Sequence, residues 1–113
     1  MGSGIACEQG EIILVPFTNL ETVKQRPVLI LSSSAVNKHS ADFICCGITS
    51  NLQNAVNSFL IDANDLERGY LPKPSRIKAG VIFTLEKSCA IKSLGKIREA
   101  SFRKVRGELL GLF

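Results

Sequence analysis

The chain has 113 residues, of which 45% are hydrophobic, and a formal net charge of +4 at pH 7. This length allows one compact domain and is too short for two, and the apolar content excludes a disordered protein. No apolar run approaches the roughly 20 residues that span a membrane, so no membrane contact is expected. Residues 1–9 are predicted to be a leader, in part left by cloning, and residues 10–113 a single domain.

The charge is divided unevenly along the chain. Residues 1–67 hold three Lys or Arg against seven Asp or Glu, whereas residues 68–113 hold eleven against three. A basic half suits a polyanion such as RNA or an acidic protein segment, and it suits an ordinary solvated surface equally well. Charge alone therefore leaves the function open.

The first three predicted strands are short runs rich in Ile, Val, Leu and Phe, at Glu11–Phe17, Pro27–Ser33 and Asp42–Thr49. A further short strand is expected at Asn57–Ala63. A longer one is expected at Ser75–Leu85.

Gly80 is predicted to bend or bulge the longest strand. The connections fall at Ser34–Ala41 and Asp65–Pro74, with a helical turn at Asp65–Gly69. The tail then changes period, because four apolar residues fall at helical spacing: Phe102, Val105, Leu109 and Leu112. The pattern predicts a mainly β fold with a C-terminal helix, in which five strands form a small, strongly bent antiparallel sheet or barrel.

The four cysteines are predicted to be reduced core residues. The chain has no CxxC pair and no histidine at ligand spacing, so no metal site is expected. Cys45 and Cys46 are neighbours in one strand and should point to opposite faces, which disfavours a disulfide between them. With no secretory signal in the sequence, we expect a cytoplasmic protein with free thiols.

Arg26 and Thr49 are the leading candidates for phosphate binding. Arg26 stands where one apolar run begins and Thr49 where the next one ends, so the two could meet at one end of the sheet. A guanidinium offers a planar fork of donors to phosphate oxygens, and a hydroxyl can add another donor. On local sequence alone, the favoured interpretations are that Arg26 is a surface residue paired with Glu21 or another acid and that Thr49 is part of a plain turn.

RNA can be cleaved without a metal when its own 2′-hydroxyl attacks the neighbouring phosphate, which requires a base and a source of positive charge. Glu21 is the candidate base, and it could instead simply hold Arg26 in place. His39 is a titratable alternative in a run that is typical of an exposed turn. Six further polar or cationic residues are candidates for RNA binding: Lys24, Ser50, Asn51, Lys73, Arg76 and Lys78.

Five short motifs occur in an order that resembles the MazF/PemK family of toxins. They are GEIILVPF, QRPVLILS, CGITS, TLEKS and the Gly95-Lys96-Ile97 run, and the resemblance covers nearly the whole chain from Gly10 onward. It implies an SH3-like barrel of the CcdB/PemK type that dimerises through its sheet. It also implies a metal-independent, cofactor-free, sequence-selective endoribonuclease acting on single-stranded RNA and restrained by a cognate acidic antitoxin.

The resemblance assigns the family's catalytic arginine and threonine to Arg26 and Thr49, and a loop acid of some members to Glu21. The chain departs from the family where several members carry a basic residue followed two positions later by aspartate. Here Lys78 is followed by Ala79 and Gly80, so the carboxylate is missing.

Two alternatives therefore stay open. One is a relative that binds RNA or the antitoxin without cleaving RNA. The other is a gyrase poison like CcdB, which is disfavoured because that activity depends on a C-terminal tryptophan and this chain has none.

Overall fold

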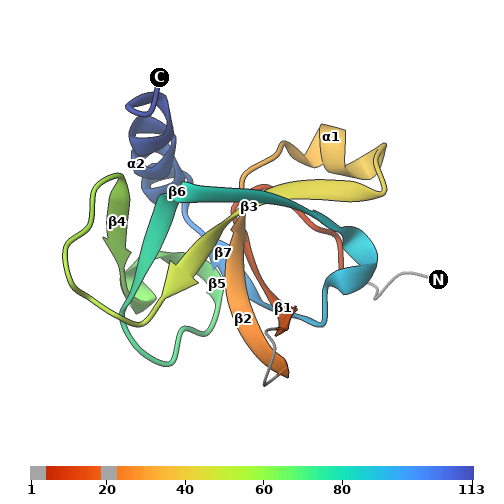
Figure 1. Cartoon of the computed structure of the whole chain (residues 1–113), viewed down its shortest axis with the longest axis horizontal. Helices are drawn as coiled ribbons and strands as arrows, with labels where there is room; N and C mark the ends of the chain where they lie inside the picture. Colours follow the sequence, from red (N-terminus) through yellow and green to blue (C-terminus); the bar gives the residue numbers. More distant parts are fainter. Residues whose placement is uncertain (1–4, 19–22) are drawn as a thin grey trace.

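The computed structural model describes residues 5–18 and 23–113. Within these ranges one antiparallel sheet curls into a half-barrel, in the strand order β4-β6-β3-β2-β1-β7-β5 (Figure 1). Its strands are β1 Glu11–Thr18, β2 Val23–Ile30, β3 Asp42–Thr49, β4 Ser58–Ile61, β5 Leu66–Gly69, β6 Ser75–Glu86 and β7 Lys92–Ile97. The helices are α1 Ser34–Lys38 and α2 Glu99–Leu110, with short 3₁₀ turns at Ala63–Asp65 and Lys87–Cys89. The expected mainly β fold with a C-terminal helix is confirmed.

The sheet separates two hydrophobic cores. The helix-side core joins apolar residues of β1, β2 and β3 to Phe102 and Val105 of α2. The far-side core lies on the other face and includes Phe43 and Ala90. Cys45 belongs to the far-side core and Cys46 to the helix-side core, which confirms that these neighbours point to opposite faces. Successive residues alternate between faces along a strand, so two continuous apolar runs can supply both cores.

The long strand β6 crosses the molecule and is irregular at its centre (Figure 1). Its pairing with β3 jumps from Ile82 to Lys78 while β3 advances by a single residue, from Cys46 to Gly47. The intervening residues of β6 therefore bulge out of the ladder, and Gly80 lies among them. The bend or bulge expected at this glycine is confirmed, because an extra stretch in one strand must leave the regular pairing.

Two strands lie where the sequence predicts none, so the expectation of five strands was wrong. β5 falls inside the connection Asp65–Pro74, and β7 follows the 3₁₀ turn after β6. The expected helical turn at Asp65–Gly69 was also wrong, because the 3₁₀ turn ends at Asp65 and the next four residues form β5, which pairs with β7. Both strands are short and rich in charged residues, and their pairing comes from segments distant in sequence.

The first predicted connection and the end of the C-terminal helix also differ in detail from the prediction. The connection Ser34–Ala41 contains α1, whose N-terminus is capped by the side chain of Ser33. Helix α2 ends at Leu110, so Leu112 lies beyond it although its spacing fits a helix. Phe102 and Val105 are buried as expected, and they fix α2 beside β4 and β6.

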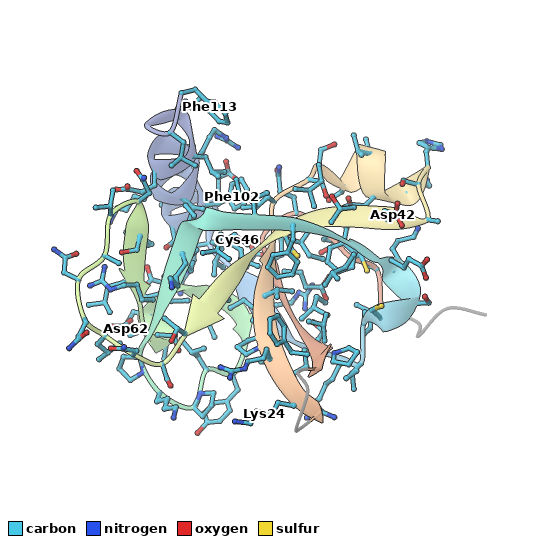
Figure 2. All side chains as sticks on the ribbon, in the orientation of Figure 1. Lys24, Asp42, Cys46, Asp62, Phe102 and Phe113 are labelled. Atoms are coloured by element: carbon cyan, nitrogen blue, oxygen red, sulfur yellow. The ribbon has the colours of Figure 1, made fainter. Side chains whose placement is uncertain are left out.

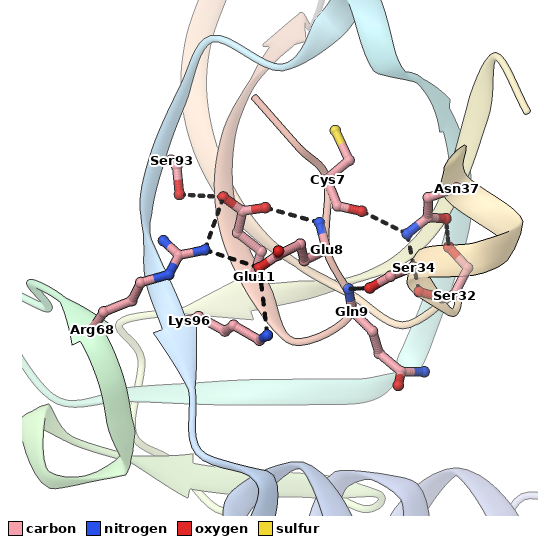
Figure 3. A network of polar contacts seen from close by, with 10 residues as sticks. All are labelled: Cys7, Glu8, Gln9, Glu11, Ser32, Ser34, Asn37, Arg68, Ser93 and Lys96. Atoms are coloured by element: carbon pink, nitrogen blue, oxygen red, sulfur yellow. Dashed lines mark hydrogen bonds and ion pairs between the residues drawn. The ribbon is translucent and has the colours of Figure 1, made fainter. Parts of the chain in front are cut away.

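The residues just before β1 contact the fold through polar groups (Figure 3). Glu11 is 2% exposed, and its carboxylate accepts hydrogen bonds from the backbone N–H of Glu8 (2.9 Å) and the hydroxyl of Ser93 (2.5 Å). Arg68 of β5 pairs with Glu8 at 3.2 Å and lies 3.7 Å from Glu11. Because Lys96 of β7 also approaches Glu8 at 3.4 Å, the residues before Gly10 are held by ion pairs to the edge strand β5 and to its neighbour β7.

Candidate functional site

Strands β2 and β3 pair at one end and separate at the other. Their ladder runs from Ile30–Cys45 to Val28–Gly47 and stops there. Continuing that register by two residues in each strand would place Arg26 opposite Thr49. Since β2 already begins at Val23, Arg26 lies inside a strand that is paired with β1, and its expected position at the mouth of a strand was wrong. Pro27 suits this place, because a strand tolerates proline where one of its edges is unpaired.

A cavity of about 600 Å³ lies at this separation. Arg26 and Thr49 both line it, so the two residues expected to share one end of the sheet do share one cavity. The cations Lys24, Lys73 and Lys92 line it as well, from β2, the loop before β6 and β7. Figure 2 shows Lys24 at the end of the molecule opposite the end of α2.

Arg26 is exposed, and its guanidinium carbon lies 6.0 Å from the centre of the Phe17 ring. A guanidinium at this distance from an aromatic ring gains a modest cation–π attraction and keeps its outer donors available. Within residues 5–18 and 23–113 Arg26 forms no salt bridge. The strand and the ring therefore orient Arg26 without neutralising its charge.

The Thr49 hydroxyl is held by a local turn. Its oxygen accepts a hydrogen bond from the backbone N–H of Asn51 at 3.1 Å, and the Asn51 side chain in turn accepts from the backbone N–H of Gln53 at 3.1 Å. Because the oxygen is used as an acceptor, the hydroxyl proton remains free to be donated. An ordered hydroxyl donor of this kind can bind an oxyanion in the cavity.

A second, smaller cavity of about 150 Å³ is also lined by Thr49. Arg76 and Lys78 of β6 line it together with Asn51. Arg76 stands opposite Thr49 in the β3–β6 ladder, and its Nη1 donates to the Ser58 hydroxyl at 2.9 Å. The Nε of Arg76 is buried and has no acceptor among the described residues.

The charge around the two cavities has one sign. Among residues 5–18 and 23–113, six cations line one or the other cavity, no Asp or Glu lines either, and none of the six cations forms a salt bridge. The described ion pairs involve other carboxylates, those of Glu8, Glu11 and Glu99. A concave surface of uncompensated cations attracts polyanions.

The residues predicted for the site fall into clear groups. Among the described ones, eight line a cavity, with Ser50 in the larger, Thr49 in both and Asn51 in the smaller. Glu21 lies outside the described residues. His39 is exposed at the end of α1 and lines neither cavity. Lys92 was missed, because its strand was not predicted and only its pairing with Leu14 of β1 brings it here.

The cysteines take no part in this site. Burial raises the pKa of Cys45 and of Cys46 to about 12, and burial also raises the pKa of Cys7. A thiol with such a pKa is protonated at neutral pH and is a poor nucleophile. Cys89 is partly exposed, and it does not line either cavity.

The fold and the cavities place the chain in a class of small curled β proteins with a cleft lined by cations. Residues 8–113 match the family described as PemK-like, MazF-like toxin of type II toxin-antitoxin system. The chain belongs to this family, which confirms the resemblance and the SH3-like barrel of the CcdB/PemK type. No match to a curated protein sequence was found.

Solved structures agree with this fold. The chain is similar to an endoribonuclease from a mycobacterial species (23% identity, TM-score 0.76), with 95% of this chain and 90% of that one covered. It is similar to a mycobacterial endoribonuclease in complex with its cognate antitoxin (25% identity, TM-score 0.75, 94% and 96% covered). It is also similar to MazE-MazF from Deinococcus radiodurans (22% identity, TM-score 0.76, 93% of each chain covered). In the described part of the chain, no helix has the length and apolar character needed to cross a membrane.

Proposed function

We propose that this toxin is an endoribonuclease that cleaves single-stranded RNA without a metal ion. One observation carries the proposal: Arg26 and Thr49 line a single cavity that is cationic and contains no carboxylate among its described lining residues. Such a donor set suits a phosphate far better than it suits a divalent cation, whose preferred ligands are carboxylate oxygens. The endoribonuclease function of structurally similar proteins supports the same reading.

The proposed reaction is an attack by the RNA on itself. The 2′-hydroxyl loses its proton to a base, its oxygen bonds to the adjacent phosphorus, and the bond from phosphorus to the 5′-oxygen breaks. The departing oxygen takes up a proton, leaving a 2′,3′-cyclic phosphate and a 5′-hydroxyl. Arg26 stabilises the negative charge that develops on the phosphorane, and Thr49 donates its hydroxyl proton to a phosphate oxygen. Glu21 remains the predicted base.

The proposed RNA strand crosses both cavities. Lys24, Ser50 and Lys73 would bind it in the larger cavity, and Asn51, Arg76 and Lys78 in the smaller one. Thr49 lines both, so the reacting phosphate would lie at their junction. A duplex presents its phosphates on a rigid cylinder, whereas a single strand can enter such a cleft and expose its bases for sequence-selective contacts.

Two protein partners belong to the proposal. The first is an acidic antitoxin that covers the cationic cavities and competes with RNA, and the structurally similar toxin–antitoxin complexes support this partner by analogy. The second is another copy of the chain. Ile44, Val81 and Ile82 are each more than 40% exposed on the neighbouring strands β3 and β6, and exposed apolar clusters favour such interfaces. Sedimentation should therefore detect a dimer that Val81→Lys weakens.

Cleavage is tested by incubating the chain and its Arg26→Ala variant with a long single-stranded RNA in EDTA. Arg103→Ala, on the exposed face of α2, is the matched control because it removes an arginine away from both cavities. We expect discrete cuts with cyclic phosphate ends for the chain and the control, and none for Arg26→Ala. Loss of cleavage on chelation would contradict the metal-free reaction.

A second candidate function is RNA or antitoxin binding without cleavage. It is favoured by Gly80, which stands where several family members carry a carboxylate, and by the lack of any acid among the described residues of the cavities. RNA that binds tightly and stays intact in the same experiment would identify it.

A further inference from the structure

Tyr70 projects from the rim of the larger cavity. It follows β5 directly and is 72% exposed, although it lines the cavity that contains Arg26 and Thr49. Within the described ranges its phenol forms no hydrogen bond. A large aromatic side chain left open to solvent beside a functional cleft is available to bind a ligand.

The backbone that carries Tyr70 is fixed from two directions. Its N–H donates to the carbonyl oxygen of Leu94 in β7 at 2.9 Å. The preceding Gly69 has φ +91°, and a Cβ there would lie 2.2 Å from that same carbonyl oxygen. Such an approach is open to glycine alone, so β5 and β7 hold Tyr70 closely in place. The next residue, Leu71, is buried in the helix-side core and anchors the other side.

The cavity below Tyr70 combines two kinds of surface. Leu71, Pro72 and Leu94 supply apolar groups close to the tyrosine, whereas Arg26, Lys73 and Lys92 supply positive charge. A purely electrostatic channel for a phosphate backbone needs only the cations. An apolar wall beside an exposed aromatic ring matches a planar, weakly polar group that is linked to an anion, and an unpaired nucleotide has this composition.

We propose that Tyr70 is the stacking platform of a nucleobase subsite next to the phosphate site of Arg26 and Thr49. The base of one nucleotide lies against the phenol ring and the apolar wall while its phosphate binds the cations. The identity of the ligand rests on the proposed function. The subsite itself goes further, because it makes base stacking a source of affinity in addition to charge.

The composition of the chain gives this proposal a direct optical test. Tyr70 is the single tyrosine and the chain has no tryptophan, so the tyrosine emission reports this one position. The ligand is a single-stranded 2′-O-methyl oligonucleotide, which cannot be cleaved because its 2′-oxygen is blocked. We expect saturable quenching of the emission on binding, since a base stacked on the phenol quenches it. A strand of the same length made of abasic nucleotides should bind through its phosphates and leave the emission nearly unchanged.

Variants test the same point by anisotropy of a labelled oligonucleotide. Tyr70→Phe keeps the ring and should bind within about twofold of the unaltered chain. Tyr70→Leu keeps an apolar side chain without the ring and should bind roughly 5- to 150-fold more weakly, the range that corresponds to one stacked base. Phe113→Leu is the matched control, because Phe113 is a fully exposed aromatic residue beyond the end of α2. Thermal unfolding of each variant verifies that the fold is intact.

The outcomes separate the subsite from the proposed nuclease. Binding without quenching, equal quenching by the abasic strand, or unchanged binding of Tyr70→Leu would overturn the subsite and leave the nuclease standing. Quenching and weakened binding of Tyr70→Leu, with ordinary RNA left uncut, would support the subsite and contradict the nuclease. If the oligonucleotide does not bind while polyglutamate does, both proposals fail and the cavity is a protein-binding surface.

Discussion

The hydroxyl of Thr49 occupies the junction of two cavities, where a small change has a large expected effect. Thr49→Val keeps the shape of the side chain and removes the donor. We expect the kcat for RNA cleavage to fall by about 10²- to 10³-fold, as for the loss of one preorganised donor to an oxyanion. Thr49→Ser, which keeps a hydroxyl, should retain most of the activity.

The control for this prediction is Thr84→Val. Thr84 is exposed on β6 outside both cavities, so it tests the same chemical change in the same sheet. Equal activity of Thr49→Val and the unaltered chain would show that the Thr49 hydroxyl takes no part in the reaction.

The buried thiols of Cys45 and Cys46 predict a specific dependence of stability on pH. Both pKa values are raised to about 12 by burial, above the usual value of about 8.5 for an unfolded chain. The unfolded state therefore loses these protons first, so the free energy of unfolding is unaffected below about pH 8 and falls as pH rises toward 12. Urea titrations at pH 7 and pH 10 measure the difference. The double variant Cys45→Ala, Cys46→Ala should show a smaller decrease between the two pH values.

At the scale of elements, the contact between β5 and β7 depends on two glycines. A Cβ on Gly69 would meet the Leu94 carbonyl oxygen, and Gly95 has φ +156° with the Arg68 carbonyl oxygen 2.4 Å from its own Cβ position. Gly69→Ala should therefore lower the free energy of unfolding by at least about 2 kcal/mol, since it adds both a clash and a strained φ.

The matched substitution is Gly107→Ala in α2, where a Cβ meets nothing within 4 Å. Alanine loses less backbone entropy than glycine when a helix forms, so the free energy of unfolding of this variant should rise by about 0.5–1 kcal/mol. Chemical denaturation of both variants provides the measurement. If Gly69→Ala raised the free energy of unfolding as Gly107→Ala does, the β5–β7 contact would be looser than the structure indicates.

The bounds of the strands show which elements could be predicted from the sequence and which could not. The strand Asp42–Thr49 was predicted with its observed bounds, because it is a continuous, mainly apolar run that supplies both cores, with Cys45 on one face and Cys46 on the other. The start of β2 was missed because Val23–Arg26 is mostly polar. Those residues pair with β1 near the end of a hairpin, where exposure permits polar side chains.

The candidate site likewise contains some residues that could be predicted from the sequence and others that could not. Arg26 and Thr49 could be found from the sequence, since each flanks a strongly apolar run and a family motif marks it. Lys92 and the position of Tyr70 could not, because they depend on β5 and β7. Those strands are held by a close approach of two glycine backbones and by ion pairs to Glu8, features that leave no periodic pattern in the sequence.

At the scale of the whole molecule, the six cations of the two cavities, which form no salt bridge within residues 5–18 and 23–113, predict a strong dependence of RNA binding on salt. Each phosphate contact with a single strand contributes about −0.7 to the slope of log affinity against log salt concentration, so full engagement gives a slope of about −4. Arg76→Gln and Lys78→Gln should each reduce the slope by about 0.7. Arg103→Gln on α2 should not change it. A slope near −1 for the unaltered chain would mean that most of these cations do not reach the RNA.

The two cores separated by the sheet have a consequence for how substitutions combine. Ile13 and Val28 are paired across β1 and β2 in the far-side core, whereas Ile12 faces the helix-side core. Ile13→Val and Val28→Ala should therefore couple, because they share packing neighbours. Ile12→Val and Ile13→Val, although adjacent in sequence, should add to within about 0.5 kcal/mol. Non-additive effects between core substitutions would therefore be confined to residues on the same face of the sheet. Over evolutionary time, the residues of each core could change independently of those of the other core.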